Sequence, residues 1–279
     1  MVDEVPGATN LRSVPIADPR MLRLLKKWLR AGVSEDGEWS PTKVGTPQGA
    51  VISPLLANVF LHYVLDLWIN DWRKRQAKGE VIIVRYADDF VIGFREIADA
   101  RKCLVALRER LTKFGLELHP DKTRLIEFGR YAEERRGKRG DGLPETFDFL
   151  GFTHICGKTR RVDFTIHRKT SRKKFQAKLA DLKKKLLRRR HDDLTMTGRW
   201  LKSVFRGWCQ YYAVPGNYMR LRQFRDALQR LWLRALRRRS QRRRRITWEQ
   251  FSRLSRPWLP APKILHPYPN VRFASQHPR

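Results

Sequence analysis

The chain has 279 residues, of which 41% are hydrophobic, and this composition excludes a disordered polypeptide and leaves room for one large domain or two ordinary ones. It carries 60 Lys and Arg against 28 Asp and Glu, a formal net charge of +32, which favours a polyanionic partner over a merely solvated face or a targeting tag. The excess lies in one half: residues 1–150 hold 25 basic and 22 acidic residues, whereas residues 151–279 hold 35 and 6.

Three widely spaced cysteines, Cys103, Cys156 and Cys209, give neither a disulfide framework nor the two-residue spacing of a zinc site. No apolar run is long enough to cross a membrane, and the N-terminal segment lacks the basic and apolar regions of a secretory signal. We therefore expect a reduced, cytoplasmic protein with no membrane partner.

Apolar residues at helical spacing predict a first helix that Asp18 and Pro19 open and Gly32 closes. Residues 35–50 have the composition of a loop with room for a short hairpin. Ser53 as N-cap and Pro54 at the first helical position predict a second helix, which is apolar nearly all round and is therefore expected to be buried.

Residues 81–94, VIIVRYADDFVIGF, predict two strands that enclose two adjacent aspartates. A helix follows that ends at Gly115, and LELHPDKTRLIEF then predicts two short strands around a turn at residues 119–122. Residues 129–146 are polar and charge-mixed and are predicted to form a loop. FDFLGFTHI and VDFTIHRK predict a further pair of strands.

From residue 170 onward the pattern is helical, with three amphipathic helices and a short fourth that starts at Thr247, where Gln250 completes a capping-box pattern. The Pro-rich tail that follows is unsuited to helix or central strand. We place a boundary near residue 168. The predicted fold class is α+β: an antiparallel sheet with helices on one face over residues 1–168, followed by an all-helical basic region over residues 169–279.

Two aspartates in a tight connection have an ordinary explanation, because Asp tolerates turn geometry. The flanking strands are so apolar, however, that Asp88 and Asp89 would repel each other beside a core unless a cation joined them. Mg²⁺ prefers oxygen ligands and is often shared with substrate phosphates, and two such ions can catalyse phosphoryl transfer. On a protein that binds a polyanion, this chemistry suggests a nucleic-acid polymerase or nuclease.

YADD between apolar strands, preceded by GTPQGAVISPLLANVFLHYVLD, resembles the palm of reverse transcriptases. HPDKT and FDFLGF are similar to the family's next two segments, the second of which is the primer grip. The segments FRGWCQYYAVPGNY, LWLRALRRRSQ and PWLPAPKILHPYP are similar to the thumb and maturase region of group II intron reverse transcriptases. The resemblance covers residues 16–269 and implies an RNA-directed DNA polymerase and intron maturase.

The resemblance implies roles for individual residues. Asp88 and Asp89 would be catalytic and bind the metal ion, Asp88 more directly because neighbouring side chains on a strand face opposite ways. Lys122 resembles a lysine that protonates the departing pyrophosphate, although a Pro-Asp turn also suits a surface lysine. Residues beside the template and nucleotide would be Tyr86, Ala87, Gly45, Pro47, Gln48, Gly49, Ser53 and Asn58.

The resemblance places the primer strand against Phe149, Leu150 and Gly151, which is compatible with core packing of the same residues. It implies Mg²⁺ as cofactor and, as partners, an RNA template, group II intron RNA, a DNA primer and dNTPs, and it leaves protein partners unknown. Seven arginines in nine residues cannot all be paired within this acid-poor half, so we predict RNA phosphate contacts at Arg237, Arg238, Arg239, Arg242, Arg243, Arg244 and Arg245.

The family pattern also has a third aspartate on an earlier strand and a fingers region before it. Residues 1–15 offer only Asp3, and its neighbours Pro6 and Gly7 do not suit a central strand. We therefore expect an N-terminally truncated member whose templated synthesis is impaired.

Two other hypotheses remain open at this point. One is a non-enzymatic, RNA-binding splicing factor that acts through residues 169–279. The other is a degenerate remnant whose exposed strand edges prevent it from folding alone. Retron and CRISPR-linked reverse transcriptases are related alternatives, but the Trp-rich tail argues against both.

Overall fold

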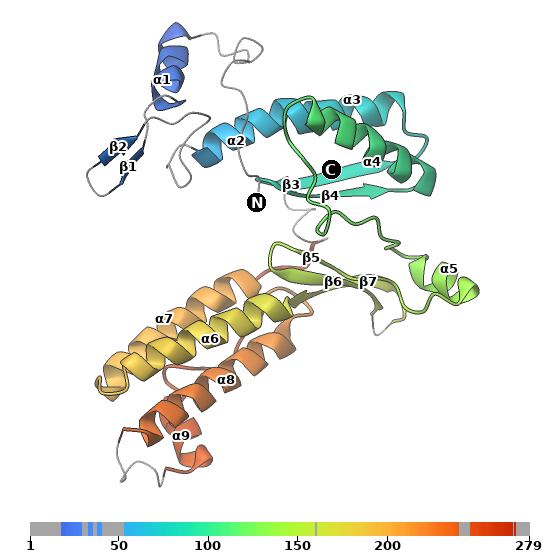
Figure 1. Cartoon of the computed structure of the whole chain (residues 1–279). Coiled ribbons are helices and arrows are strands. Elements are labelled where there is room, and N and C mark those ends of the chain that lie inside the picture. Colours follow the sequence, from blue (N-terminus) through green and yellow to red (C-terminus); the bar gives the residue numbers. More distant parts are fainter. Residues whose placement is uncertain are drawn as a thin grey trace. The chain divides into compact units, whose positions relative to one another are not determined.

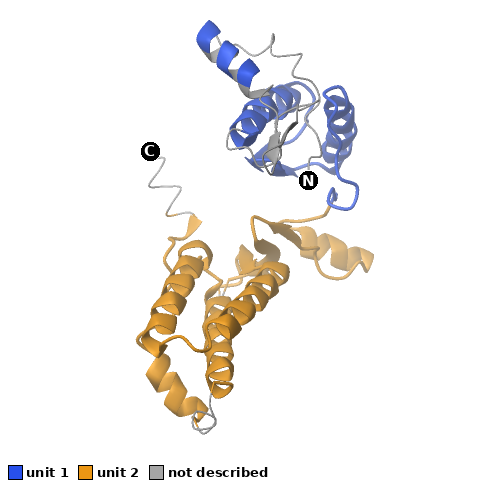
Figure 2. Cartoon of the chain, turned by 60° about the vertical axis from the view of Figure 1, so that its left-hand side comes forward, with its two compact units in different colours: residues 1–125 blue, residues 126–279 orange. Residues whose placement is uncertain are grey.

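The computed structural model describes residues 18–29, 33–35, 38–40, 53–159, 161–239, 246–269 and 271. The chain divides into two compact units, residues 1–125 and residues 126–279 (Figure 2). Helices combine with small antiparallel sheets, which confirms the α+β class. The predicted boundary near residue 168 follows the change in composition, whereas the second unit starts earlier and contains strands as well as helices.

The first unit begins with the predicted helix, α1 (Pro19–Leu29), and a short hairpin of β1 (Val33–Glu35) and β2 (Glu38–Ser40), which starts two residues before the segment in which the sequence left room for one (Figure 1). Helix α2 (Ser53–Leu61) starts at the predicted residue and continues through a π-helical turn, η2 (His62–Asp66), into α3 (Leu67–Arg75). The turn is π-helical because the Leu67 N–H donates to the His62 carbonyl, five residues earlier.

The prediction that the helix from Ser53 is buried is wrong for α2, which has no buried residue and leaves Leu55 59% exposed. Burial begins further along, at Val64 and Leu65 of η2 and Ile69 and Trp72 of α3. The reason is the position of the packing partners, because only the end of α2 reaches the clusters that η2 and α3 build.

Strands β3 (Val81–Tyr86) and β4 (Asp89–Phe94) form the predicted hairpin, and their register runs from Val81 opposite Phe94 to Tyr86 opposite Asp89. Helix α4 (Ile97–Thr112) follows and ends before Gly115, which has the left-handed φ of 68° that favours glycine there. Figure 1 shows α3 and α4 together on one face of this hairpin. The opposite face exposes alternate β3 side chains, with Ile82 55%, Val84 53% and Tyr86 66% exposed.

The two strands predicted on either side of residues 119–122 are absent, although the turn itself is present: the His119 carbonyl accepts from the N–H groups of Lys122 and Thr123. The apolar alternation of this segment has another use. Leu116 is buried and Leu118 half-buried against the cluster that contains Leu107 and Leu111 of α4. The segment packs on a helix and pairs with no described strand. Its alternating apolar residues therefore reflect burial of every second side chain and not membership of a β-sheet.

The second unit opens with a helix where a loop was expected, α5 (Ala132–Arg139). A pair at helical spacing, Glu134 and Lys138, is joined at 2.7 Å, and Gly140 ends the helix with φ 76°. The loop prediction was wrong because this helix has almost no apolar stripe to reveal it. Helices that are polar all round rely on ion pairs between side chains four residues apart.

Strands β5 (Phe147–Phe149), β6 (Phe152–Lys158) and β7 (Phe164–Thr170) form an antiparallel sheet in that order. The segment predicted as one strand, residues 147–155, is therefore two strands joined by Leu150 and Gly151. Both turn residues have left-handed φ, 49° and 77°, which is the pattern of a two-residue type I′ hairpin.

All four predicted helices of the basic region are present: α6 (Arg172–Arg188), α7 (Leu194–Tyr212), α8 (Tyr218–Arg237) and α9 (Trp248–Ser255). Side chains cap three of them: Ser171 accepts from the Lys174 N–H, Asp193 from that of Thr195, and Thr247 forms the predicted capping box with Gln250. The apolar faces build one core, whose fully buried side chains include Leu201, Leu221, Phe224, Leu228, Trp232 and Phe251.

The three cysteines are unpaired thiols, and burial raises the pKa of Cys103 to about 12 and that of Cys209 to about 11. These thiols therefore stay protonated and act as small apolar groups. Within the described ranges, no helix combines the length and hydrophobicity needed to cross a membrane.

Candidate functional site

The two aspartates lie at the tip of the β3–β4 hairpin, as predicted. The register leaves Ala87 and Asp88 as the two central residues of the turn, and Asp89 begins β4 opposite Tyr86. Ala87 has a φ of 53°, in the left-handed region that residues other than Gly, Asn and Asp rarely adopt. The tip is therefore a strained, tightly specified turn that presents both carboxylates.

Both carboxylates are exposed, and neither makes a hydrogen bond or ion pair with another residue of the described ranges. They offer adjacent oxygen donors with vacant lone pairs, which suits Mg²⁺, an ion bound through one or two carboxylates while phosphates and water complete its shell. No group of three His, Cys, Asp or Glu side chains that could hold a metal occurs in the part of the chain described. The residues present fit a shared, two-carboxylate site.

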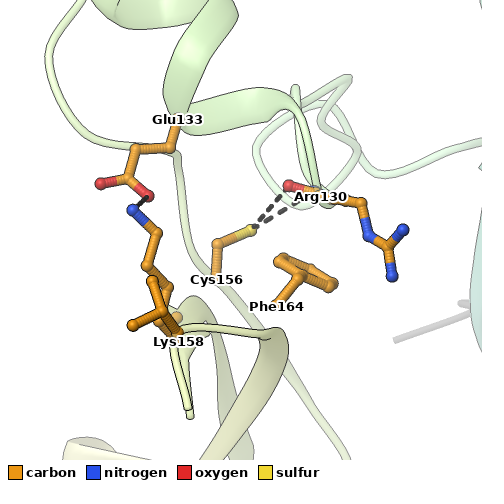
Figure 3. A pocket seen from close by; sticks show the side chains of 8 residues that line it. Arg130, Glu133, Cys156, Lys158 and Phe164 are labelled. Carbon is orange, nitrogen blue, oxygen red and sulfur yellow. Dashed lines mark hydrogen bonds and ion pairs between the residues drawn. The ribbon is translucent and has the colours of Figure 1, made fainter. Parts of the chain in front are cut away.

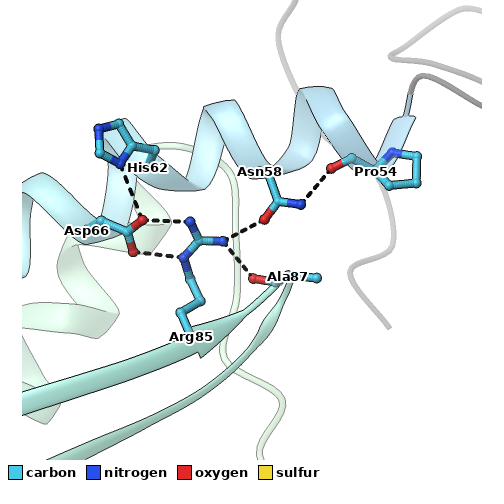
Figure 4. A network of polar contacts seen from close by, with 6 residues as sticks. All are labelled: Pro54, Asn58, His62, Asp66, Arg85 and Ala87. Carbon is cyan, nitrogen blue, oxygen red and sulfur yellow. Dashed lines mark hydrogen bonds and ion pairs between the residues drawn. The ribbon is translucent and has the colours of Figure 1, made fainter. Parts of the chain in front are cut away.

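Behind the turn, Arg85 of β3 reaches the helix that carries α2 and η2 (Figure 4). Its Nε and Nη2 donate to the two oxygens of Asp66 at 2.7 and 2.6 Å, a bidentate pair. Its Nη1 donates to Asn58 Oδ1 and to the carbonyl of Ala87, both at 2.9 Å. One guanidinium thus joins the helix to the turn that contains Asp88.

The Arg85–Asp66 pair is partly sheltered, since the two side chains are 13% and 28% exposed. The hydrogen bonds from Arg85 lower the pKa of Asp66, with a smaller effect of His62, whose Nδ1 lies 3.4 Å from Asp66 Oδ2. The same pair raises the pKa of Arg85. Both groups therefore stay charged, which keeps the pair in its strong, charge-assisted form.

Sequence reasoning missed Arg85 and Asp66, although a signal was present. In VIIVRY the alternation puts Arg85 on the same face as Val81 and Ile83, which pack inward, so a charged side chain there needs a partner. A suitable partner was Asp66, a carboxylate within the apolar pattern VLDLW of the helix that precedes β3.

The structure places the predicted template and nucleotide residues unevenly. Ser53 begins α2, and Asn58 lies one turn further, where its Nδ2 donates to the Pro54 carbonyl and its Oδ1 accepts from Arg85. The Asn58 side chain therefore belongs to the hydrogen-bond network through which Arg85 holds the β3–β4 turn. The loop residues of the same prediction, Gly45, Pro47, Gln48 and Gly49, lie outside the described residues.

Lys122 lies exposed in the turn that closes on the His119 carbonyl. Asp88 and Asp89 lie in the same unit and are also described, but no hydrogen bond or ion pair joins either of them to the Lys122 side chain. The structure therefore does not bring this lysine into contact with the carboxylates.

The predicted primer-grip residues Phe149, Leu150 and Gly151 lie at the β5–β6 turn of the second unit. The Tyr211 hydroxyl of α7 donates to the Leu150 carbonyl at 2.8 Å, and the Tyr211 ring stacks on Phe152 at 5.7 Å. A Cβ on Gly151 would lie 2.8 Å from the Tyr212 hydroxyl. The turn is thus seated closely on the helical core, which agrees with the packing role that the sequence left open.

Three of the predicted RNA-binding arginines lie at the end of α8 and just beyond it. Arg237 Nη2 donates to the Ile246 carbonyl at 2.7 Å, and Arg239 Nη1 donates to the Asp192 carbonyl at 2.8 Å. Arg238 is exposed. Two of the guanidiniums therefore also brace neighbouring segments, and the remaining members, Arg242, Arg243, Arg244 and Arg245, lie outside the described residues.

A small cavity of about 230 Å³ lies between α5 and the β6–β7 hairpin (Figure 3). Glu133 and Lys158 form an ion pair at 3.1 Å at its edge, and the Cys156 thiol accepts from the Gly129 N–H at 3.3 Å. None of the predicted site residues lines it, and its walls are Gly129, Arg130, Glu133, Cys156, Gly157, Lys158, Val162 and Phe164.

Comparison with known proteins identifies the family. The family model of reverse transcriptase (RNA-dependent DNA polymerase) matches residues 8–154, more than half of the chain. The group II intron-encoded protein LtrA of Lactococcus lactis is 45% identical over 65 residues, which is 22% of this chain and 10% of LtrA.

Two fungal proteins extend the match. A COX1/OXI3 intron 1 protein of Saccharomyces cerevisiae is 26% identical over 278 aligned residues, 75% of this chain and 32% of that protein. A 91 kDa protein in the cob intron of Schizosaccharomyces pombe is 31% identical over 134 residues, 44% of this chain and 16% of that protein. The matched region spans no more than a third of any of these three relatives. The chain belongs to the reverse transcriptase family, and the relatives that it matches include a group II intron-encoded protein.

Proposed function

We propose that the chain works in an RNA-directed DNA polymerase and intron maturase of the group II type, with residues 1–168 as part of the palm and residues 169–279 as the thumb and RNA-binding region. The observation that carries the proposal is the Ala87–Asp88 turn, where two exposed carboxylates without a partner among the described residues stand at the end of a braced hairpin. The family match supports it, because reverse transcriptases act on nucleic acid and use divalent metal ions.

In this mechanism Asp88 and Asp89 would hold Mg²⁺ by their carboxylate oxygens. When bound, the ion would supply charge neutralisation for the nucleotide phosphates and activation of the primer hydroxyl. The strained turn keeps the two carboxylates adjacent, so little reorganisation is needed when the metal and the phosphates arrive. Tyr86, 66% exposed opposite Asp89, offers its ring to the primer end or the incoming nucleotide.

Three further assignments belong to the proposal. Lys122 protonates the departing pyrophosphate when substrate brings the two together. Gly45, Pro47, Gln48, Gly49 and Ser53 border the template and nucleotide. The Leu150–Gly151 turn contacts the primer backbone, and its seat on Tyr211 and Tyr212 makes it a rigid contact surface.

The basic half holds the RNA by its phosphates. Helix α6 carries a run of exposed cations, Lys183, Lys184 and Lys185, and within the described ranges only Lys185 of these three is paired, with Asp181 at 2.9 Å. Such a surface binds RNA by shape and charge, so its affinity falls steeply with salt. The family match favours polymerase function, and no comparison favours RNA binding without catalysis.

Primer extension on an RNA template with the full 279-residue chain tests the proposal. We expect weak Mg²⁺-dependent extension, consistent with the impaired templated synthesis expected from the sequence, and Asp88→Ala should abolish it. Asp163→Asn is the control, because Asp163 is also an exposed aspartate beside a hairpin strand, in the loop before β7, and it should leave extension unchanged. Absence of extension by the unsubstituted chain, or equal extension by Asp88→Ala, would refute the assignment.

A further inference from the structure

Among the described residues, Arg85 is the one side chain that hydrogen-bonds both to the helix bearing η2 and to the turn bearing Asp88 (Figure 4). Its four hydrogen bonds go to three groups: the Asp66 carboxylate, the Asn58 amide oxygen and the Ala87 carbonyl. The Ala87 carbonyl belongs to the residue directly before Asp88. Any rotation of the Ala87 peptide would also redirect the Asp88 side chain.

The π-helical turn explains why Asn58 and Asp66 can share one guanidinium. They are eight residues apart, and in a continuous α-helix this spacing would turn their side chains about 80° from each other. The wider hydrogen-bonded ring of η2 adds one residue to its turn, so eight residues act as seven and the two side chains point within about 20°. The irregularity therefore aligns two acceptors toward Arg85.

The geometry of arginine suits this task and that of lysine does not. A guanidinium is planar with five N–H donors in a fixed fork, and here Nε and Nη2 face Asp66 while Nη1 faces the turn. An ammonium could meet one of these groups but could not bridge them in the same plane. Substitution by lysine keeps the charge and removes the bridge.

We propose that Arg85, oriented by Asp66 and Asn58, is a positioning residue that holds the Ala87 peptide in its left-handed conformation and thereby fixes the Asp88 carboxylate for divalent cation binding. The metal-binding half of this statement rests on the proposed function, whereas the structural half does not. Outer partners of this kind are worth about 10- to 100-fold in metal affinity where they orient a metal-binding side chain.

Two readouts on the full chain test the proposal in Arg85→Lys, Arg85→Met and Asp66→Asn. The first is amide hydrogen exchange of residues 86–90, which we expect to accelerate about tenfold or more when the charged hydrogen bond is lost. The second is binding of Mn²⁺, followed by paramagnetic broadening of the same amides, whose midpoint we expect to rise about tenfold. Asp66 is 28% exposed, so water can hydrate its carboxylate when Arg85 is replaced. We therefore expect the variants to fold.

Arg75→Met is the matched control, because Arg75 pairs with Asp71 at 2.8 Å on the exposed side of the neighbouring α3. It removes the same charge from the same unit and should change neither readout. Unchanged exchange in both Arg85 variants would overturn the positioning role. If Arg85→Met proves unfolded, Asn58→Ala removes one of the four bonds and must still accelerate exchange at the turn.

The metal readout separates this inference from the proposed function. Broadening that is the same in Asp88→Asn and the unsubstituted chain would overturn metal binding at the turn, while the exchange data still decide on Arg85. Specific Mn²⁺ binding that is indifferent to Arg85→Lys and Asp66→Asn would overturn the link from Arg85 to the metal.

Discussion

Gly151→Ala tests how firmly the predicted primer-grip turn is seated on the helical core. Gly151 has a φ of 77°, and an added Cβ would lie 2.8 Å from the Tyr212 hydroxyl, closer than real Cβ contacts come. Tyr212 cannot swing away freely, because it is 8% exposed and packs on Trp208 and Phe152. The substitution therefore combines backbone strain with a steric clash.

The two effects can be separated in magnitude. Placing alanine in the left-handed region costs about 1–2 kcal/mol, and overpacking a buried contact adds about 1–3 kcal/mol. A methyl group also restricts the unfolded chain, which returns about 0.4–1 kcal/mol. We expect Gly151→Ala to lower the free energy of unfolding of the second unit by about 2–4 kcal/mol.

Gly216→Ala provides the matched control within the same unit. Gly216 lies between α7 and α8 with a φ of 87°, and its added Cβ would meet only His167 Nδ1, at an ordinary 3.9 Å. This variant carries the strain without the clash, so it should cost about 1 kcal/mol. The difference between the two variants isolates the contact with Tyr212.

Urea unfolding is the measurement, followed by hydrogen exchange of β6, β7 and α7 so that the second unit is observed by itself. Tyr212→Phe in the Gly151→Ala background removes the clashing oxygen and leaves the ring carbon Cζ at 3.6 Å, so it should recover most of the extra loss. Equal costs for Gly151→Ala and Gly216→Ala, or no recovery with Tyr212→Phe, would refute the close seating of the turn.

Three further outcomes follow from contacts described above. Arg85 lowers the folded pKa of Asp66 below its unfolded value of about 3.9. Asp66 therefore stabilises the fold above that pH, and this stabilisation is lost as the pH falls through the folded pKa. In urea unfolding measured over a range of pH, Asp66→Asn should reduce the loss of stability at acid pH. Ala87→Gly should stabilise the hairpin by about 0.5–1 kcal/mol, because glycine adopts the left-handed φ without strain, and a loss of stability in thermal unfolding would contradict this. Asn217 is fully buried and bonds to Thr170 twice and to the Tyr212 carbonyl, so Asn217→Ala should cost about 2–4 kcal/mol in urea unfolding, whereas a cost near zero would mean that water replaces the side chain.

The sequence predicted best where one signal determined the structure. Hydrophobic periodicity placed α6, α7 and α8, and local capping chemistry placed the start of α9 at Thr247. Prediction from the sequence failed where one pattern fits two structures. The alternation at Leu116 and Leu118 suits a strand but here serves packing on a helix. The polar composition of α5 suits a loop, but charge pairs hold it as a helix.

The candidate site shows the same division. The adjacent aspartates were evident from the sequence, and the hairpin tip is where the structure places them. The brace behind them was not, because it depends on the π-helical turn that brings Asn58 and Asp66 into line, and no periodicity rule predicts a single extra residue within a turn. Long-range polar partners of this kind follow from tertiary geometry.

The π-helical turn makes the number of residues between Asn58 and Asp66 a functional quantity. Deleting one residue from His62–Leu65 would give a regular α-helix in which Asn58 and Asp66 stand seven positions apart, so the two side chains would still point within about 20° of each other and the apolar side chains of α3 would keep their partners in β3 and α4. A one-residue insertion at the same place would instead rotate every later side chain by about 100°, away from those partners. A single deletion should therefore be better tolerated at η2 than elsewhere in the helix, and a scan of single deletions and insertions across residues 53–75 would test this.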